Sequence, residues 1–224
     1  MKKFFTLLCV AFLATSLFAN VVTGTCGDNL QWAYDTDTHA LTITGSGDMY
    51  WSGERPWAQV ASEITSVSLP DGLTSIGDYA FSSCSISTII IPYGVTRIGS
   101  DAFRWCTFLG DILIPCTVTS IGYHAFWFGD GHSNNGTITY FYITAPTLEE
   151  YCNSSVNQLL EDFYYSRRLV IAGQELTEVV LPNSVTSIRE YLFSDMQYLT
   201  SITIPNSVVN IGRSVFEDCH SLKS

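Results

Sequence analysis

The chain has 224 residues, of which 46% are hydrophobic and only 14% are charged. This composition excludes a disordered chain and a coiled coil, and the length allows one or two domains with a sizeable core. Acidic residues outnumber basic ones by 21 to 10. Such a surface repels phosphate backbones and anionic lipids, so nucleic acid is not an expected partner.

Residues 1–19 have the features of a secretory signal peptide. Lys2 and Lys3 form a basic start, an apolar stretch follows, and Ala19 is a small residue before the cleavage point. The stretch is short for a membrane span, and no other segment approaches the ~20 apolar residues that a span needs. We therefore expect an exported protein, secreted or at the cell surface. Without the two lysines, 8 basic residues face 21 acidic ones, a net charge of about −13.

Residues 20–63 are predicted to form an N-terminal β cap. Residues 30–34 and 40–44 alternate apolar and polar side chains on either side of a turn-forming segment, which is typical of a β-hairpin. A solenoid needs a cap over its first coil. The apolar cover is expected from three tryptophans, Trp32, Trp51 and Trp57.

A repeat of 22 to 23 residues begins at residue 64. Each clear copy reads L-x-x-I-x-I-P, then V-T-x-I-G, then A-F-x-x-C, with variations. The copies align on five prolines, Pro70, Pro92, Pro115, Pro182 and Pro205. This period is the length of a leucine-rich repeat, in which each copy forms one coil of a solenoid and buries its apolar face against the next coil.

Each part of the repeat predicts a local structure. The alternating apolar residues before the proline predict a strand, which the proline ends. The V-T-x-I-G segment predicts a second short strand. Its glycine is expected at a sharp corner with positive φ, and this position is held by Gly77, Gly99, Gly122 and Gly212. The A-F-x-x-C segment is expected to make one helical turn with its phenylalanine inward.

The stretch 127–175 lacks the motif but has the length of the repeat. Pro115 and Pro182 are 67 residues apart, close to three periods, so we expect two degenerate coils between them. Strands are predicted at 138–143 and 168–171.

A short helix is predicted between these two strands. Thr147 and Glu150 have the spacing of a capping box, which places the start of the helix near Leu148.

The predicted fold is therefore a β-dominated α/β leucine-rich repeat solenoid over residues 64–224, with an N-terminal β-hairpin cap. Its C-terminal end is expected to be open, because residues 222–224 match 199–201 and begin a further coil. Further repeats or self-association are expected partners at that edge.

The outward side chains of the strands form the candidate ligand-binding face. One predicted column of equivalent positions contains a contiguous apolar row, Ile90, Leu113, Tyr142 and Val180, and Tyr140 lies in the neighbouring column. Solenoids commonly bind ligands on such a face, and tyrosine is a frequent interface anchor. Two alternatives remain: these residues are simply good strand formers, or the nearby helix covers the row.

The sequence offers no catalytic, metal or cofactor motif. The patterns GxSxG, HExxH, GxxxxGK[ST] and CxxC and the Rossmann glycine pattern are all missing. Asp35 with Asp37, or the loop 129–136 with His132, could bind Ca²⁺, but such residues also form ordinary turns. A catalytic pair of Cys152 with a histidine has no supporting signature. We expect no catalytic residues, no metal and no cofactor.

Six cysteines remain after the signal segment, which allows 15 pairings in an oxidising compartment. Cys84 and Cys106 are equivalent positions of adjacent coils, so a disulfide between them is geometrically possible. A column of buried thiols is the alternative, favoured because Cys219 has no neighbour in the column.

Residues 73–84 and 199–208 closely resemble the repeats of BspA-like leucine-rich repeat proteins, and residues 26–32 with 41–49 resemble their leader. Arg189 departs from the pattern at a glycine position, as do Gly129 and Met196 at cysteine positions. The resemblance implies a leucine-rich repeat solenoid and an exported or surface protein of host-associated bacteria or some protozoa.

For function, the resemblance implies adhesion to, or binding of, host or matrix proteins. The alternatives are a structural component of a surface array or an exported hydrolase with dispersed catalytic residues.

Overall fold

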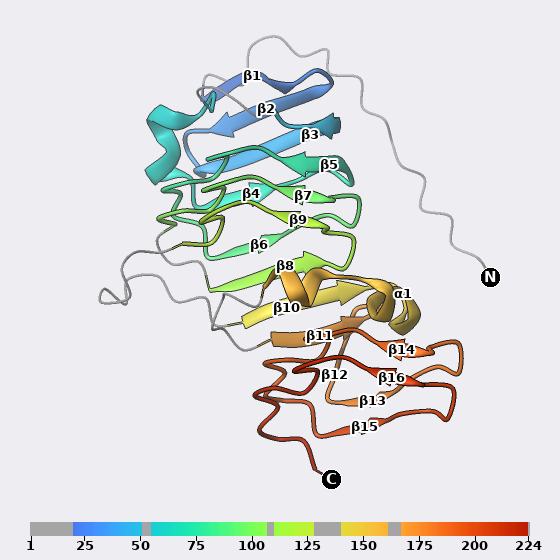
Figure 1. The fold of residues 1–224 in the computed structure, drawn as a ribbon. Coiled ribbons are helices and arrows are strands. Elements are labelled where there is room, and N and C mark those ends of the chain that lie inside the picture. Colours follow the sequence, from blue (N-terminus) through green and yellow to red (C-terminus); the bar gives the residue numbers. More distant parts are fainter. Residues whose placement is uncertain (1–19, 51–54, 107–109, 128–139, 161–166, 224) are drawn as a thin grey trace, which may run out of the picture.

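The computed structural model describes residues 20–50, 55–106, 110–127, 140–160 and 167–223. Its strands stack one above another along a single direction, with the N-terminal strands at one end and the C-terminal coils at the other (Figure 1). The expected signal peptide, residues 1–19, lies outside the described residues, as do Trp51, Gly129 and His132.

The N-terminal unit is a three-stranded antiparallel meander of β1 (Val21–Gly27), β2 (Leu30–Asp35) and β3 (Ala40–Asp48). The predicted hairpin is confirmed as β2 and β3, whose register pairs Trp32 with Ile43. The sequence analysis missed β1, whose residues alternate only weakly between apolar and polar. Of the expected cover, Trp32 and Trp57 are buried.

This meander continues directly into the solenoid. The first half of β3 pairs in parallel with β4 (Ser66–Ser68), and its second half pairs in parallel with β5 (Gly72–Ile76). A 3₁₀ helix, η1 (Ala58–Glu63), lies between β3 and β4 in the chain. One strand of the meander thus supplies a partner for both strands of the first coil.

Each regular coil contributes two short strands, as the repeat predicts. The first strand of each coil ends at or just before the proline, and the later ones are β6 (Thr88–Ile90), β8 (Asp111–Pro115), β13 (Glu178–Val180) and β15 (Ser201–Thr203). The second strands are β7 (Arg97–Ile98), β9 (Ser120–Ile121), β14 (Ser187–Ile188) and β16 (Asn210–Ile211). Strands of the same kind in adjacent coils pair in parallel, except that β4 pairs with β3 and not with β6.

The irregular centre has the predicted strands and helix. In chain order its elements are β10 (Tyr140–Ala145), α1 (Leu148–Asn153), α2 (Val156–Leu159), β11 (Arg167–Ile171) and β12 (Gln174–Leu176). The hydroxyl of Thr147 accepts a hydrogen bond from the backbone N–H of Glu150, which confirms the predicted cap of α1. The strands join the sheet β12-β11-β10-β8-β6, in which only the β11–β12 pair is antiparallel.

The centre divides the regular coils into two groups. We call residues 64–127 the N-terminal stack and residues 176–223 the C-terminal stack. Arg167 joins the centre to the C-terminal stack: its fully buried guanidinium lies 3.3 Å from the Asp195 carboxylate and donates to the Ser194 hydroxyl over 2.7 Å. A buried ion pair of this kind needs such additional hydrogen bonds to offset the free-energy cost of removing both charges from water.

Aromatic rings run through the core of both stacks. In the N-terminal stack, Phe103 lies between Phe81 and Phe126, with ring centroids 5.4 and 5.3 Å apart, and Trp57 continues the row at 5.9 Å from Phe81. In the C-terminal stack, Phe193 contacts Tyr151 at 5.7 Å and Phe216 at 5.9 Å. The inward phenylalanine predicted from the repeat is confirmed.

The helical turn predicted for the A-F-x-x-C segment is wrong. The segment forms consecutive tight turns, such as Ser82 N–H to Tyr79 C=O at 3.0 Å, and alternate N–H groups bond to the next coil, as Phe81 does to Ala102 at 2.7 Å. The first turn residue has positive φ in every regular coil, at Tyr79, Asp101, His124, Tyr191 and Ser214. This left-handed residue aims the following N–H groups along the solenoid instead of back into a helix.

The glycine that ends the second strand does not have positive φ, contrary to the prediction. It is required by close contact between coils. A Cβ at Gly122 would lie 2.3 Å from the backbone nitrogen of Ser100, and one at Gly212 would lie 2.4 Å from that of Glu190. Arg189 replaces this glycine after β14, which pairs with β16 of the following coil and with no described strand of a preceding coil.

Candidate functional site

The predicted columns of outward side chains are confirmed where the strands pair. Thr88, Asp111 and Tyr140 lie in register, and Ile90, Leu113 and Tyr142 lie in register beside them. Ile90 is 63% exposed, whereas Leu113, Tyr140 and Tyr142 are half-buried. These residues form one continuous surface across β6, β8 and β10, which we call the strand face.

The predicted contiguity of Val180 with this row is wrong. The register neighbour of Tyr142 on its other side is Arg168 of β11. Val180 lies on β13, in a separate two-stranded sheet, where it pairs with Thr203 and is 70% exposed. The alignment of repeats passed over β11 because its segment lacks the L-x-x-I-x-I-P motif.

Arg168 forms the centre of an aromatic cluster that the sequence analysis did not anticipate. Its guanidinium carbon lies 4.2 Å from the ring centroid of Tyr140 and 3.8 Å from that of Tyr198, within the range of cation–π contacts. The Tyr142 ring is farther, at 6.0 Å. The guanidinium also forms an ion pair with Glu175 of β12. We call Tyr140, Tyr142, Arg168 and Tyr198 the tyrosine–arginine cluster.

The tyrosines of this cluster contact one another as well. The Tyr140 and Tyr198 hydroxyls are 2.7 Å apart, and the Tyr140 ring meets those of Tyr142 and Tyr198 edge-on, at 6.0 and 5.6 Å. Hydrogen bonding with Tyr198, and then with Arg168, lowers the pKa of the Tyr140 hydroxyl. Burial raises the pKa of Tyr142. Tyr198 comes from the C-terminal stack, so the cluster connects the centre with the C-terminal stack on one surface.

The cluster has the composition of a recognition surface. It presents flat rings and one cation whose donors are held in place by Glu175 and by the two flanking rings. Tyrosine and arginine combine large contact area with directed hydrogen bonds, which makes them frequent anchors of protein interfaces. No pairing of a nucleophile with a general base occurs within it.

The cysteines are poor nucleophiles because burial raises their pKa values. The pKa of Cys84 is raised to about 12, and those of Cys26, Cys152 and Cys219 to about 11. The thiolate, which is the reactive form, is therefore scarce at neutral pH. Cys84 and Cys106 are buried, and Cys106 donates a hydrogen bond to the Phe81 carbonyl over 3.0 Å. This agrees with the column of buried thiols.

Neither candidate calcium site gains support from the structure. Asp35 accepts hydrogen bonds from the backbone N–H groups of Asp37 and Thr38, at 2.9 and 3.0 Å, which is the usual role of aspartate in a turn. Among the described residues, no group of three or more His, Cys, Asp and Glu side chains has the arrangement of a metal site. The whole loop 129–136, with His132, lies outside the described residues, so the structure does not test this second candidate.

Comparison with known proteins agrees with the repeat architecture. The family described as BspA type leucine rich repeat region matches in six copies, over residues 59–159 and 170–224. A search of curated proteins found no match.

Similar solved structures include a leucine-rich repeat protein of Eubacterium ventriosum (19% identity, TM-score 0.43, covering 91% of this chain and 71% of that one). Another is the leucine rich repeat protein of T. pallidum, with 19% identity and a TM-score of 0.33, covering 89% of this chain and 91% of that one. A third is a leucine rich cell surface protein of Faecalibacterium prausnitzii, with 18% identity and a TM-score of 0.29, covering 90% of this chain and 75% of that one. Because the family matches well over half of the chain, this protein belongs to the BspA-type leucine-rich repeat proteins.

Proposed function

We propose that this protein is an exported, non-catalytic binding module that attaches to host or matrix proteins at the cell surface through its strand face. The tyrosine–arginine cluster is the observation that carries the proposal. It places three tyrosines and one arginine at one end of the row that runs from Tyr142 through Leu113 to the exposed Ile90. The predicted anchors Leu113, Tyr140 and Tyr142 belong to this surface, and Arg168 and Tyr198 complete it.

The physical basis is preorganisation. Arg168 is held between two rings and paired with Glu175, so little side-chain entropy remains to be lost when a partner covers it. Next to it, the row from Tyr142 to Ile90 supplies apolar area that water covers in the free protein. Anchors beside apolar area are the usual composition of a protein–protein interface core.

Export and surface location are supported by the family and by the signal features of residues 1–19. None of the described helices is long and apolar enough to cross a membrane. Proteins of this family and fold are typically non-catalytic, and the raised thiol pKa values favour the same conclusion for the cysteines.

The test is a pull-down of the mature chain, residues 20–224, against extracellular matrix and host-cell surface proteins. The double variant Leu113→Asp with Tyr142→Ser places a charge in the row and removes a ring of the cluster. It should lose saturable binding at unchanged circular dichroism. Val180→Ser is the control, because it removes an exposed apolar side chain from the separate sheet and should bind as the parent does.

If the double variant still binds, the strand face is not the binding surface. If no matrix or surface protein binds to a folded, monomeric chain, the adhesion proposal fails and the structural-array alternative gains weight. Turnover of a glycosidic or peptide substrate by the purified chain would favour the hydrolase alternative.

A role in a surface array has one observation in its favour, the exposed apolar side chain of Ile211 in the last described coil. Ile211 is 56% exposed, whereas Ile188 at the same repeat position of the preceding coil is 1% exposed. A further coil, or a second copy of this chain, would cover this side chain and pair with β15 and β16. Sedimentation velocity tests this role: Ile211→Lys should abolish any concentration-dependent association of the parent chain.

A further inference from the structure

The outermost strand, β1, presents a free edge at the N-terminal end of the sheet (Figure 1). Among the described residues it pairs only with β2. The Asn20 carbonyl accepts a hydrogen bond from the Thr36 N–H over 2.8 Å, so Asn20 bonds toward β2. In an antiparallel pair, residues whose backbone groups bond to the partner strand alternate with residues whose backbone groups point away from it. The backbone groups that point away from β2 are therefore those of Val21, Thr23 and Thr25.

This edge lacks the usual protection against pairing with another strand. Natural edge strands carry charged residues, prolines or bulges, or are very short. β1 has seven residues, V-V-T-G-T-C-G, without a charge or a proline. Its one irregularity lies between Thr25 and Gly27, so the regular part, residues 21–25, remains able to accept a neighbour.

A cavity of about 460 Å³ adjoins the inner face of this edge. Val22, which is 52% exposed, and the aromatic rings of Trp32 and Trp57 contribute to its wall, as does Val60 of η1. Arg55 supplies the only charged side chain of the lining. It donates to the backbone carbonyls of Tyr79 and Ser82 and forms no ion pair with a described residue.

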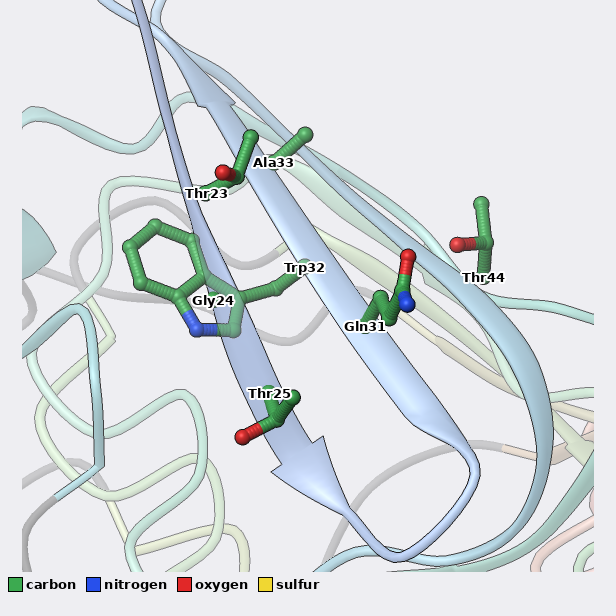
Figure 2. A pocket seen from close by; sticks show the side chains of 7 residues that line it. All are labelled: Thr23, Gly24, Thr25, Gln31, Trp32, Ala33 and Thr44. Carbon is green, nitrogen blue, oxygen red and sulfur yellow. The ribbon is translucent and has the colours of Figure 1, made fainter. Parts of the chain in front are cut away.

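A second hollow of about 330 Å³ adjoins the outer face of the same edge, and Figure 2 shows its lining. Its side chains are mostly polar and uncharged, Thr23, Thr25, Gln31 and Thr44. The Trp32 indole lies across Gly24, where a Cβ would be 2.7 Å from its nitrogen. This nitrogen has no hydrogen-bond partner although Trp32 is only 7% exposed.

We propose that β1 binds an extended peptide segment of a partner protein as an added strand. Side chains alternate between the faces of a strand. Every second residue of the peptide would enter the cavity beside Val22, which favours apolar side chains, and the others would face the threonines, which favours small hydroxyl residues. The charge of Arg55, which has no ion-pair partner among the described residues, selects one acidic residue among the inward positions. This site is separate from the strand face.

The probes are fluorescein-labelled eight-residue peptides that alternate valine or phenylalanine with threonine and carry one glutamate. Scrambled peptides of the same composition are the controls. Anisotropy titration of the mature chain should give a Kd in the micromolar range for the alternating set, at least about tenfold tighter than for the scrambled set.

Thr23→Pro is the decisive variant, because its N–H points away from β2 and proline is tolerated there while an added strand is blocked. It should weaken peptide binding at least about tenfold at unchanged circular dichroism. Thr23→Ala keeps the N–H and should bind within about twofold of the parent. Should Thr23→Pro unfold the cap, Arg55→Gln gives a second measure: it should reduce the preference for glutamate over glutamine in the peptide.

Three results would overturn the proposal. The first is that no alternating peptide binds more tightly than its scrambled control. The second is that a folded Thr23→Pro variant binds as the parent does or, if that variant unfolds, that Arg55→Gln leaves the glutamate preference intact. The third is that the edge mediates dimerisation and excludes the peptides, which would assign β1 to a second copy of this chain.

Discussion

The N-terminal and C-terminal stacks are built from the same repeat, but equivalent side chains of the repeat are buried to different extents in the two stacks. In the N-terminal stack three strands, β5, β7 and β8, have a paired strand on each side. In the C-terminal stack only two coils pair with each other. The repeat position of Ile98 and Ile188 is buried, whereas Ile211 at the same position is half exposed. What a repeat residue contributes therefore depends on the coil next to it, as expected for a solenoid.

The largest expected difference between the stacks concerns the phenylalanine row. Phe103→Ala removes a ring that is fully buried between two others, and the cavity it leaves should cost about 4 kcal/mol. Phe216→Ala removes the equivalent, partly exposed ring of the last coil and should cost about half as much. Urea unfolding of both variants tests the comparison, and equal losses would contradict it.

The glycine position should show the next largest effect. Gly122→Ala forces a Cβ to within 2.3 Å of the Ser100 nitrogen, so the coils must move apart, at a cost of about 2–3 kcal/mol. Arg189→Ala changes an exposed residue at the same repeat position and should shift stability by less than about 0.5 kcal/mol. Thermal unfolding measures both. A tolerated alanine at position 122 would show that close coil contact does not explain the glycine.

A smaller effect is expected where the two stacks join. Thr147→Ala removes the hydroxyl that caps α1 and should lower stability by about 1 kcal/mol. Thr147→Ser keeps a capping oxygen and is the matched control. If both variants lose the same amount of stability, the contribution comes from the methyl group of Thr147, which both substitutions remove, and not from the capping hydroxyl.

The smallest expected effect is a pH dependence at the junction between the cap and the first coil. The Thr74 hydroxyl donates to the Asp48 carboxylate over 2.6 Å, and this bond, followed by one from Ser75, lowers the pKa of Asp48 below its ordinary 3.8. With the Thr74 bond as the main cause of the lowered pKa, the ionised carboxylate favours the folded state above pH 3.8, and this contribution disappears as pH falls through the lowered pKa.

Thr74→Val should therefore reduce stability slightly at pH 6 and not at all at pH 2. Chemical unfolding of the parent and the variant at both pH values is the measurement. A stability difference that is the same at both pH values would mean that the hydroxyl acts without the charge of Asp48.

The regular coils could be predicted from the sequence because each element repeats its own signal. Proline ends the first strand, and alternating apolar residues set the register that pairs Ile90 with Leu113. Thr147 and Glu150 marked the one capped helix of the centre. In each case a local physical preference and the repeat period point to the same structure.

The failures have a common cause, since they depend on neighbours that sequence spacing does not reveal. Tyr79 and Asp101 adopt positive φ although nothing in their side chains signals it, so the turns looked helical. Gly122 is required by the backbone of the coil before it and not by its own φ. Arg168 is the register neighbour of Tyr142 because β11, whose segment lacks the repeat motif, pairs with β10.

Native-state hydrogen exchange of the mature chain tests the difference between the stacks most directly. The amides of Gly99 and Gly212 make equivalent bonds to the coil before them, to the carbonyls of Ile76 and Ile188, at 2.9 and 2.8 Å. The account predicts that Gly99 exchanges only through global unfolding, whereas Gly212 exchanges through local opening of the uncovered last coil. Equal protection of the two amides would contradict it, because the repeat alone would then decide stability and the neighbouring coil would not.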